Sequence, residues 1–145
     1  MRTLQTERLG ISLAVCDMLV QAPGGRYISL FPAWDRTQDA SFKNLLTKGA
    51  VEVSASWSTA RQEAYNISVR ARPEHKGAVR IAGLDCKEPA ATLAVKCADG
   101  SAPQPHTTVD GVVSFVAPAS VRCVLVCGNG SNSFAGGVGL AATGR

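Results

Sequence analysis

The sequence predicts a mainly β protein, an antiparallel β-sandwich preceded by one N-terminal helix. The spacing of the apolar residues is helical at the start of the chain and becomes alternating after residues 23–25, "PGG". Short apolar runs then recur, separated by Gly, Pro and Asp, at the spacing typical of sandwiches and open barrels. Of the 145 residues, 46% are hydrophobic and 18% charged, which is the composition of a folded domain.

The predicted helix runs from Glu7 to Val20 and has little polar face. One apolar stripe consists of Leu9, Leu13, Cys16 and Val20, and a second of Ile11, Val15, Met18 and Leu19. We therefore expect neighbours around most of its circumference. Gly24 and Gly25 follow, and glycine just past a helix end allows a sharp exit.

The predicted strands begin with Tyr27 to Phe31, where Pro32 ends the ladder because it has no N–H to donate. The segments "AVEVSASW" and "YNISVRAR" alternate apolar and polar residues, which predicts a hairpin with one buried and one solvent-facing side. Further strands are "AVRIAG", "TLAVK", "VVSFV" and "VRCVLV". Asp110 and Gly111 suit a tight hairpin turn. The sandwich spans residues 23–127, and residues 128–145 form a Gly/Ser-rich tail that we expect to be disordered.

The cysteines number five, an odd count without a C-x-x-C pair: Cys16, Cys86, Cys97, Cys123 and Cys127. On one strand Cys123 and Cys127 would lie about 13 Å apart, too far for one zinc ion. We expect no metal and interpret the cysteines as small buried hydrophobes. A disulfide such as one between Cys97 and Cys123 is the alternative in an oxidising compartment, and spacing alone does not pair them.

The charge distribution, the length of the apolar runs and the motifs of the sequence argue against several functions. The net charge is +4 and its residues are scattered singly, so the sequence has no nucleic-acid footprint. No apolar run approaches the roughly 20 residues of a membrane helix. The start of the chain does not read as a signal peptide, because Thr6, Glu7 and Arg8 interrupt its apolar stretch, and localisation stays open. The sequence contains no phosphate loop and no dinucleotide fingerprint, so we expect no cofactor.

The run "LGISLAVCDMLVQAPGGRYISLFPAW", continued by "DASFKNLLTKGAVEVSASW", points to a family. It resembles the junction between the catalytic barrel and the C-terminal β domain of glycoside hydrolase family 95, the α-L-fucosidase-like enzymes. Three parts match in order: a helix end at residues 17–21, a strand end at residues 30–34, and residues 46–53, which resemble the family's Leu-x-x-x-Gly-Ala/Gly-Phe-x-Val segment. The resemblance covers roughly Thr6 to Leu84. It implies that residues 1–22 are the terminal helix of a truncated (α/α)6 barrel and that such a helical catalytic barrel is the partner.

The same resemblance bears on catalysis. The family carries an acid in a Gln-Ile-Asp-Gly-Asn-Phe-Gly motif before this helix, and aligning its last Gly with Gly10 puts Thr6 at that acid. Glu7 is the neighbouring candidate, although an acid in the first turn of a helix is also favoured by the helix dipole. Glycoside hydrolysis needs two carboxyl groups flanking one bond, and no such pair is evident. We therefore expect no catalysis by this chain alone.

Two functions follow as hypotheses. In the first, the chain is a non-catalytic C-terminal β domain, a fragment or degenerate copy, that braces a barrel. In the second, it is a free-standing carbohydrate-binding module with Trp34, Trp57 or Tyr65 stacked on a sugar. Trp57 and Tyr65 fall on apolar strand faces, which favours the core, whereas Trp34 follows a proline in a loop and is the candidate glycan-binding residue. We also predict that Trp34 seals the seam between helix and sheet and sends its indole N–H to a polar partner.

Overall fold

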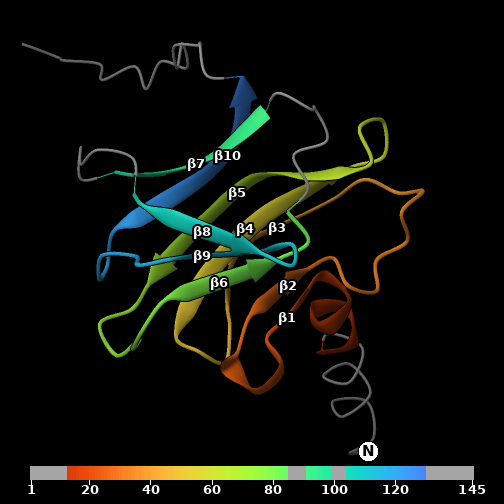
Figure 1. Cartoon of the computed structure of the whole chain (residues 1–145). Coiled ribbons are helices and arrows are strands. Elements are labelled where there is room, and N and C mark those ends of the chain that lie inside the picture. The colour runs from red at the N-terminus through yellow and green to blue at the C-terminus, as the bar shows by residue number, and fades with distance from the viewer. Residues whose placement is uncertain (1–12, 85–90, 99–103, 130–145) are drawn as a thin grey trace, which may run out of the picture.

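The computed structural model describes residues 13–84, 91–98 and 104–129. A helix over residues 13–19 precedes the strands (Figure 1). The further elements are β1 (Val20–Gln21), the 3-10 turn η1 (Pro23–Gly25), β2 (Ile28–Leu30), β3 (Ala40–Leu46), β4 (Val51–Ser58), β5 (Glu63–Ala71), β6 (Val79–Ala82), β7 (Ala91–Cys97), β8 (His106–Val109), β9 (Val112–Phe115) and β10 (Arg122–Asn129). Among these residues, no helix is long and apolar enough to cross a membrane.

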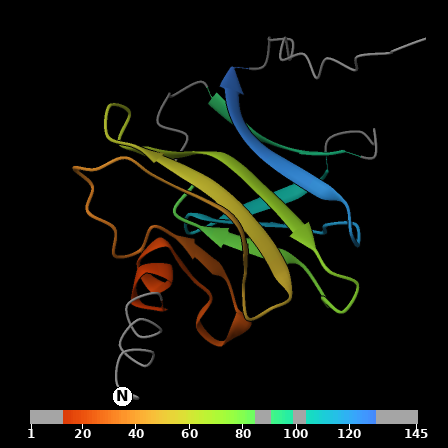
Figure 2. The same cartoon turned by 180° about the vertical axis from the view of Figure 1, so that it is seen from behind.

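The strands form two sheets that pack face to face (Figures 1 and 2). The first sheet has the order β1-β2-β6-β9-β8 and the second sheet the order β3-β4-β5-β10-β7. Every named pair is antiparallel except β2 with β6. Parallel neighbours need a long crossover, and here strands β3 to β5 of the second sheet supply it. The predicted β-sandwich preceded by one helix is confirmed.

The core lies between the sheets and follows the predicted alternation. In β4 the inward residues are Val51, Val53, Ala55 and Trp57, and in β5 they are Ile67, Val69 and Ala71. Phe31 is fully buried at the centre of an aromatic group, with its ring centroid 5.4 Å from that of Phe42 and 6.1 Å from that of Trp57. These rings close the end of the sandwich nearest the helix.

The strand predicted from Tyr27 to Phe31 is β2 in the structure, and it is shorter than predicted. It stops at Leu30 because Phe31 adopts a left-handed backbone with φ of 53°, which points its ring into the core. The Phe31 N–H donates to the Leu19 carbonyl at 2.7 Å, and the Ala33 N–H to the Met18 carbonyl at 3.4 Å. Two otherwise unpartnered carbonyls of the helix end are thereby satisfied. The chain after β2 therefore fixes the last helical turn to the sandwich.

The glycine pair has a different place from the predicted one. The helix ends at residue 19, and β1 pairs directly with β2, Val20 lying opposite Leu30. Gly24 and Gly25, with φ of 60° and 68°, turn the chain between β1 and β2. Left-handed backbone favours glycine at these positions. The pair thus closes a hairpin, and the helix exits without it.

One further strand and one boundary also differ from the prediction. β3 pairs with β4 and was not predicted as a strand, because only Phe42 within it is buried and its alternation is weak. Asn44, with φ of 55°, lies where the register with β4 shifts. β10 continues to Asn129, two residues past the predicted end of the sandwich at residue 127. The remainder of that tail lies outside the described residues. The start of the predicted helix also lies outside them.

Three of the cysteines in the described residues are disulfide-bonded. Cys97 and Cys123 are opposite each other in β7 and β10 and are bonded, 26 residues apart in sequence. Cys127 is disulfide-bonded as well, whereas Cys16 is a free, half-buried thiol. The interpretation of the cysteines as plain buried hydrophobes is wrong for the bonded residues, and the alternative pairing of Cys97 with Cys123 is confirmed.

Candidate functional site

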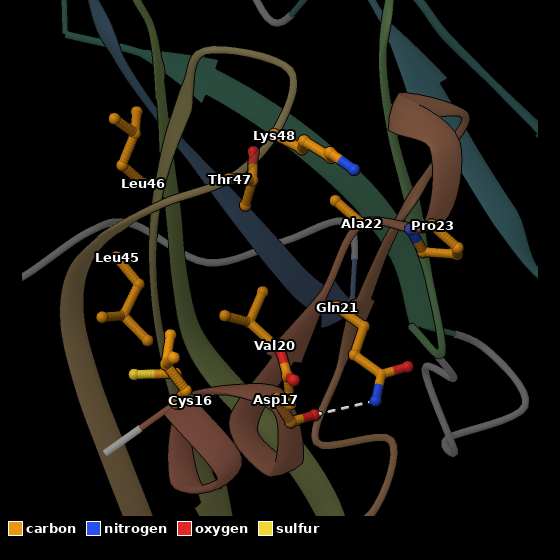
Figure 3. Close-up of a pocket in the computed structure, with 11 residues that line it drawn as sticks. Cys16, Asp17, Val20, Gln21, Ala22, Pro23, Leu45, Leu46, Thr47 and Lys48 are labelled. Carbon is orange, nitrogen blue, oxygen red and sulfur yellow. Dashed lines mark hydrogen bonds between the residues drawn. The ribbon is translucent and has the colours of Figure 1, made fainter. Parts of the chain in front are cut away.

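A groove of about 510 Å³ lies between the helix, β1 and the end of β3 (Figure 3). The side chains of Cys16, Val20 and Leu45 gather on one side of it (Figure 3). The full lining is Leu13, Cys16, Asp17, Val20, Gln21, Ala22, Pro23, Leu45, Leu46, Thr47 and Lys48. The predicted stripe of Leu13, Cys16 and Val20 therefore faces this groove.

The groove has an uncovered apolar residue on each wall. Leu13 of the helix is 65% exposed, and Leu46 at the end of β3 is 54% exposed. Val15, which is also on the helix but does not line the groove, is 41% exposed. Leu19, in contrast, packs against the core. The helix is therefore covered on one side by the sandwich, while the residues described here leave its other side open. An open apolar helix face next to a groove is typical of an interaction surface.

The polar groups of the groove are few. Gln21 Nε2 donates to the backbone carbonyl of Asp17 at 3.0 Å, and Lys48 stands on the opposite wall. Asp17 is the one carboxylate among the lining residues, whereas glycoside hydrolysis requires a pair. No group of three or more potential metal ligands occurs in the described part of the chain. The described lining of the groove therefore offers mainly apolar contact.

The predicted acid position cannot be placed. Thr6 and Glu7 lie outside the described residues. The described part of the chain thus begins after the segment that the resemblance relates to the catalytic acid.

Trp34 lies in the loop between β2 and β3, half-buried against the core. Its indole Nε1–H donates to the Gln38 carbonyl at 2.9 Å, so the predicted polar partner exists. Its neighbour Ala33 bonds to the last helical turn, which places the tryptophan beside the junction of helix and sandwich. Because the Trp34 ring is half-buried and its N–H is already bonded, its exposed part is what remains for contact with another molecule.

Two aspartates hold this loop in shape. Asp35 accepts hydrogen bonds from the backbone N–H and hydroxyl of Thr37 at 2.9 and 2.7 Å. Asp39 accepts from the same two groups of Thr59 at 2.7 and 2.8 Å. These bonds stabilise the ionised carboxylates and lower the pKa of both groups. The loop carrying Trp34 is therefore anchored at two points.

The other two aromatic candidates are already engaged. Trp57 is buried, its Nε1–H donates to the Arg36 carbonyl at 3.4 Å, and the Arg36 guanidinium lies 4.1 Å from its ring centroid. Tyr65 is half-buried with the Arg61 guanidinium 5.6 Å from its ring. The expectation that Trp57 belongs to the core is confirmed.

The histidines have structural surroundings. His75 and His106 are each half-buried. His75 Nδ1 lies 2.6 Å from the Gly49 carbonyl and, since a carbonyl only accepts, it donates the proton. This bond ties the segment after β5 to the turn between β3 and β4. His106 begins β8, with Nδ1 3.5 Å from the Gln104 carbonyl.

An ion-pair cluster that was not predicted lies on the outer side of the second sheet. Arg70 donates to Glu52 Oε2 through Nε and Nη2 at 3.0 and 2.6 Å, and Arg72 donates to Oε1 through the same two atoms at 3.1 and 2.9 Å. Hydrogen bonds from Arg72 and Arg70 lower the pKa of the Glu52 carboxyl. The hairpin register puts Glu52 directly opposite Arg70, so cross-strand pairing was the signal that could have found this cluster.

Comparison of the chain with protein-family models, with curated proteins and with solved structures finds no match. The class that the fold and site define is a disulfide-bonded β-sandwich with an attached, partly uncovered helix. Its function is therefore inferred from its own residues.

Proposed function

We propose that this chain is the non-catalytic C-terminal β domain of a glycoside hydrolase family 95-like (α-L-fucosidase-like) protein, a fragment or degenerate copy, that braces a helical catalytic barrel. The supporting observation is the helix at residues 13–19. Its last turn is hydrogen-bonded to the sandwich, while Leu13 and Val15 remain uncovered beside a groove of about 510 Å³. An apolar helix fixed at one end and open along its side suits packing against further helices.

Two of the three segments that support the resemblance line this groove, and the third bonds to the helix beside it. Residues 17–21 form one wall together with the helix, and residues 46–48 form the other. Residues 30–34 bond to the helix end through Phe31 and Ala33. Three segments separated in sequence are thus close together at the helix end, as the proposed junction between a barrel and a β domain requires. This proximity supports the proposal.

The partner's chemistry follows from the groove. Leu13, Val15 and Leu46 would be buried by apolar faces of neighbouring helices, and burying one such side chain contributes about 1.5–3 kcal/mol. Asp17 and Lys48 at the same groove offer one charge of each sign to polar residues at the edge of that contact. A contact of this kind holds two parts of a protein together and takes no part in catalysis.

The alternative is a free-standing carbohydrate-binding sandwich. It is favoured by Trp34, which is only half-buried and sits in a loop anchored by Asp35 and Asp39. A fixed aromatic ring is a usual sugar-stacking element in binding modules. Loss of glycan binding in Trp34→Ala without loss of stability would select this alternative.

The first test is the gene sequence. We expect the reading frame upstream of Met1, or an adjacent gene, to encode further barrel helices, and their absence from both would overturn the proposal.

The second test is co-elution. The encoded barrel is co-expressed with this chain, and co-elution of the two is measured by size-exclusion chromatography. Leu13→Asp should abolish co-elution.

The matched control is Val116→Asp, because Val116 is 67% exposed, close to the 65% of Leu13, and lines no part of the groove. It should co-elute as the unmodified chain does. Equal behaviour of the two variants would show that the barrel does not pack on this helix.

A further inference from the structure

A second pocket, separate from the helix groove, lies on the solvent side of the first sheet. It has a volume of about 450 Å³ and is lined by Arg26, Tyr27, Arg80, Thr107, Val109, Val112 and Ser114. None of these residues lines the groove beside the helix. The two sites are therefore available to different partners.

Strand register explains how the pocket is built. Arg80 of β6 lies opposite Ser114 of β9, and Ser114 lies opposite Thr107 of β8, so the three side chains form one row. Val112 and Val109 are paired in the neighbouring row on the same face. Val113, between Val112 and Ser114, and Ile81, next to Arg80, are buried and point inward. The sheet thus presents hydroxyls and a short apolar floor beside an arginine.

The charge of the pocket is positive and uncompensated. Within the described part of the chain, neither the Arg26 nor the Arg80 side chain has an ion-pair or hydrogen-bond partner, and no lining residue is acidic. The contrast is with Arg70 and Arg72, whose guanidinium groups are both engaged by Glu52. Two free guanidinium groups at one pocket favour an anion, and a planar carboxylate fits their paired N–H donors.

The rest of the lining favours a sugar as the carrier of that carboxylate. The side chain of Tyr27 is 39% exposed, and Val109 is 64% exposed, so both offer an apolar surface to the C–H face of a pyranose ring. The hydroxyls of Thr107 and Ser114 can exchange hydrogen bonds with sugar hydroxyls. Single-stranded nucleic acid is less well suited, because it requires several rings for successive bases and Tyr27 is the one aromatic residue of the lining.

We propose that this pocket binds an acidic carbohydrate, with a uronate carboxylate held by Arg26 and Arg80 and the sugar ring packed on Tyr27. This site does not depend on the proposed bracing role. It would give the domain a ligand of its own on the side of the first sheet that faces away from the second.

The test measures binding of trigalacturonate to the full chain by isothermal titration calorimetry, with galactotriose as the neutral probe and a short oligothymidylate as the non-sugar polyanion. We expect trigalacturonate to bind and the other two to bind at least tenfold more weakly. Arg80→Gln and Tyr27→Ala should each weaken trigalacturonate binding tenfold or more, since each removes one recognition element.

The matched control is Lys43→Gln, which also removes one positive charge but lies on β3 of the second sheet. It should leave the affinity within twofold, and thermal melts verify that all variants are folded. Absence of trigalacturonate binding at millimolar concentration would overturn the proposal. Equal affinity for galactotriose would overturn the role of the carboxylate, and equal affinity for oligothymidylate would show a general polyanion surface.

Discussion

Replacing Cys97 and Cys123 together by alanine removes the covalent link between β7 and β10 and leaves the bond of Cys127 in place. The link closes a loop of 26 residues, and its removal returns that loop's freedom to the unfolded chain. The chain-entropy relation gives a loss of about 3.5 kcal/mol in the free energy of unfolding at 25 °C, within the range of about 2–5 kcal/mol for native disulfides.

The assay is urea denaturation under non-reducing conditions. With an m value of about 2 kcal/mol/M, the midpoint of the double variant should fall by about 1.7 M. Cys16→Ala is the control, because Cys16 is a free and only half-buried thiol, and its midpoint should hardly move. A fall of less than about 0.5 M in the double variant, or an equal fall in the control, would refute the assignment of stability to this disulfide.

Four further outcomes are expected. Phe31→Ala should cost about 3–5 kcal/mol in denaturant melts because Phe31 is fully buried, and Trp34→Ala less because Trp34 is half-buried; equal losses would contradict this. The lowered pKa of Glu52 stabilises the fold above the ordinary pKa of about 4.3, and this contribution is lost as the pH falls through the folded pKa. Acid melts of Glu52→Gln should therefore show a weaker pH dependence, and an unchanged acid profile would count against the cluster. The isolated chain should self-associate or bind a hydrophobic dye through its uncovered helix, and Leu13→Asp should reduce both; a clean monomer without dye binding is the opposite result. The purified chain should not hydrolyse aryl α-L-fucosides above the buffer rate, whereas turnover that disappears in Glu7→Gln would disprove the non-catalytic role.

The sequence was sufficient where one local rule decides the structure. Alternation in "AVEVSASW" and "YNISVRAR" predicted the β4–β5 hairpin, because one side of it is buried and the other is not. Asp110 and Gly111 form the predicted turn, both with positive φ, at 50° and 71°. These elements depend on neighbours in sequence, and their pattern is therefore visible without the fold.

Features that depend on distant contacts escaped prediction. Phe31 leaves its strand because Phe42 and Trp57 provide a place for its ring, and nothing in its local sequence indicates a left-handed backbone. β3 has only one buried residue, so its alternation is too weak to recognise. The groove and the arginine pocket each combine segments that are far apart in the chain, and neither is visible in any one of them.

The parallel pairing of β2 with β6 has a consequence for the order of folding. Ile28 pairs with Ile81, so β2 cannot take its place in the first sheet until β3, β4, β5 and β6 have been synthesised. Contacts of such long sequence separation form slowly because the loop between them must first close. We expect the β4–β5 hairpin to form earlier, since its strands are adjacent in sequence. During synthesis the helix and the β1–β2 hairpin therefore have no neighbouring strand until β6 is made, and the apolar residues of that segment stay uncovered for that time.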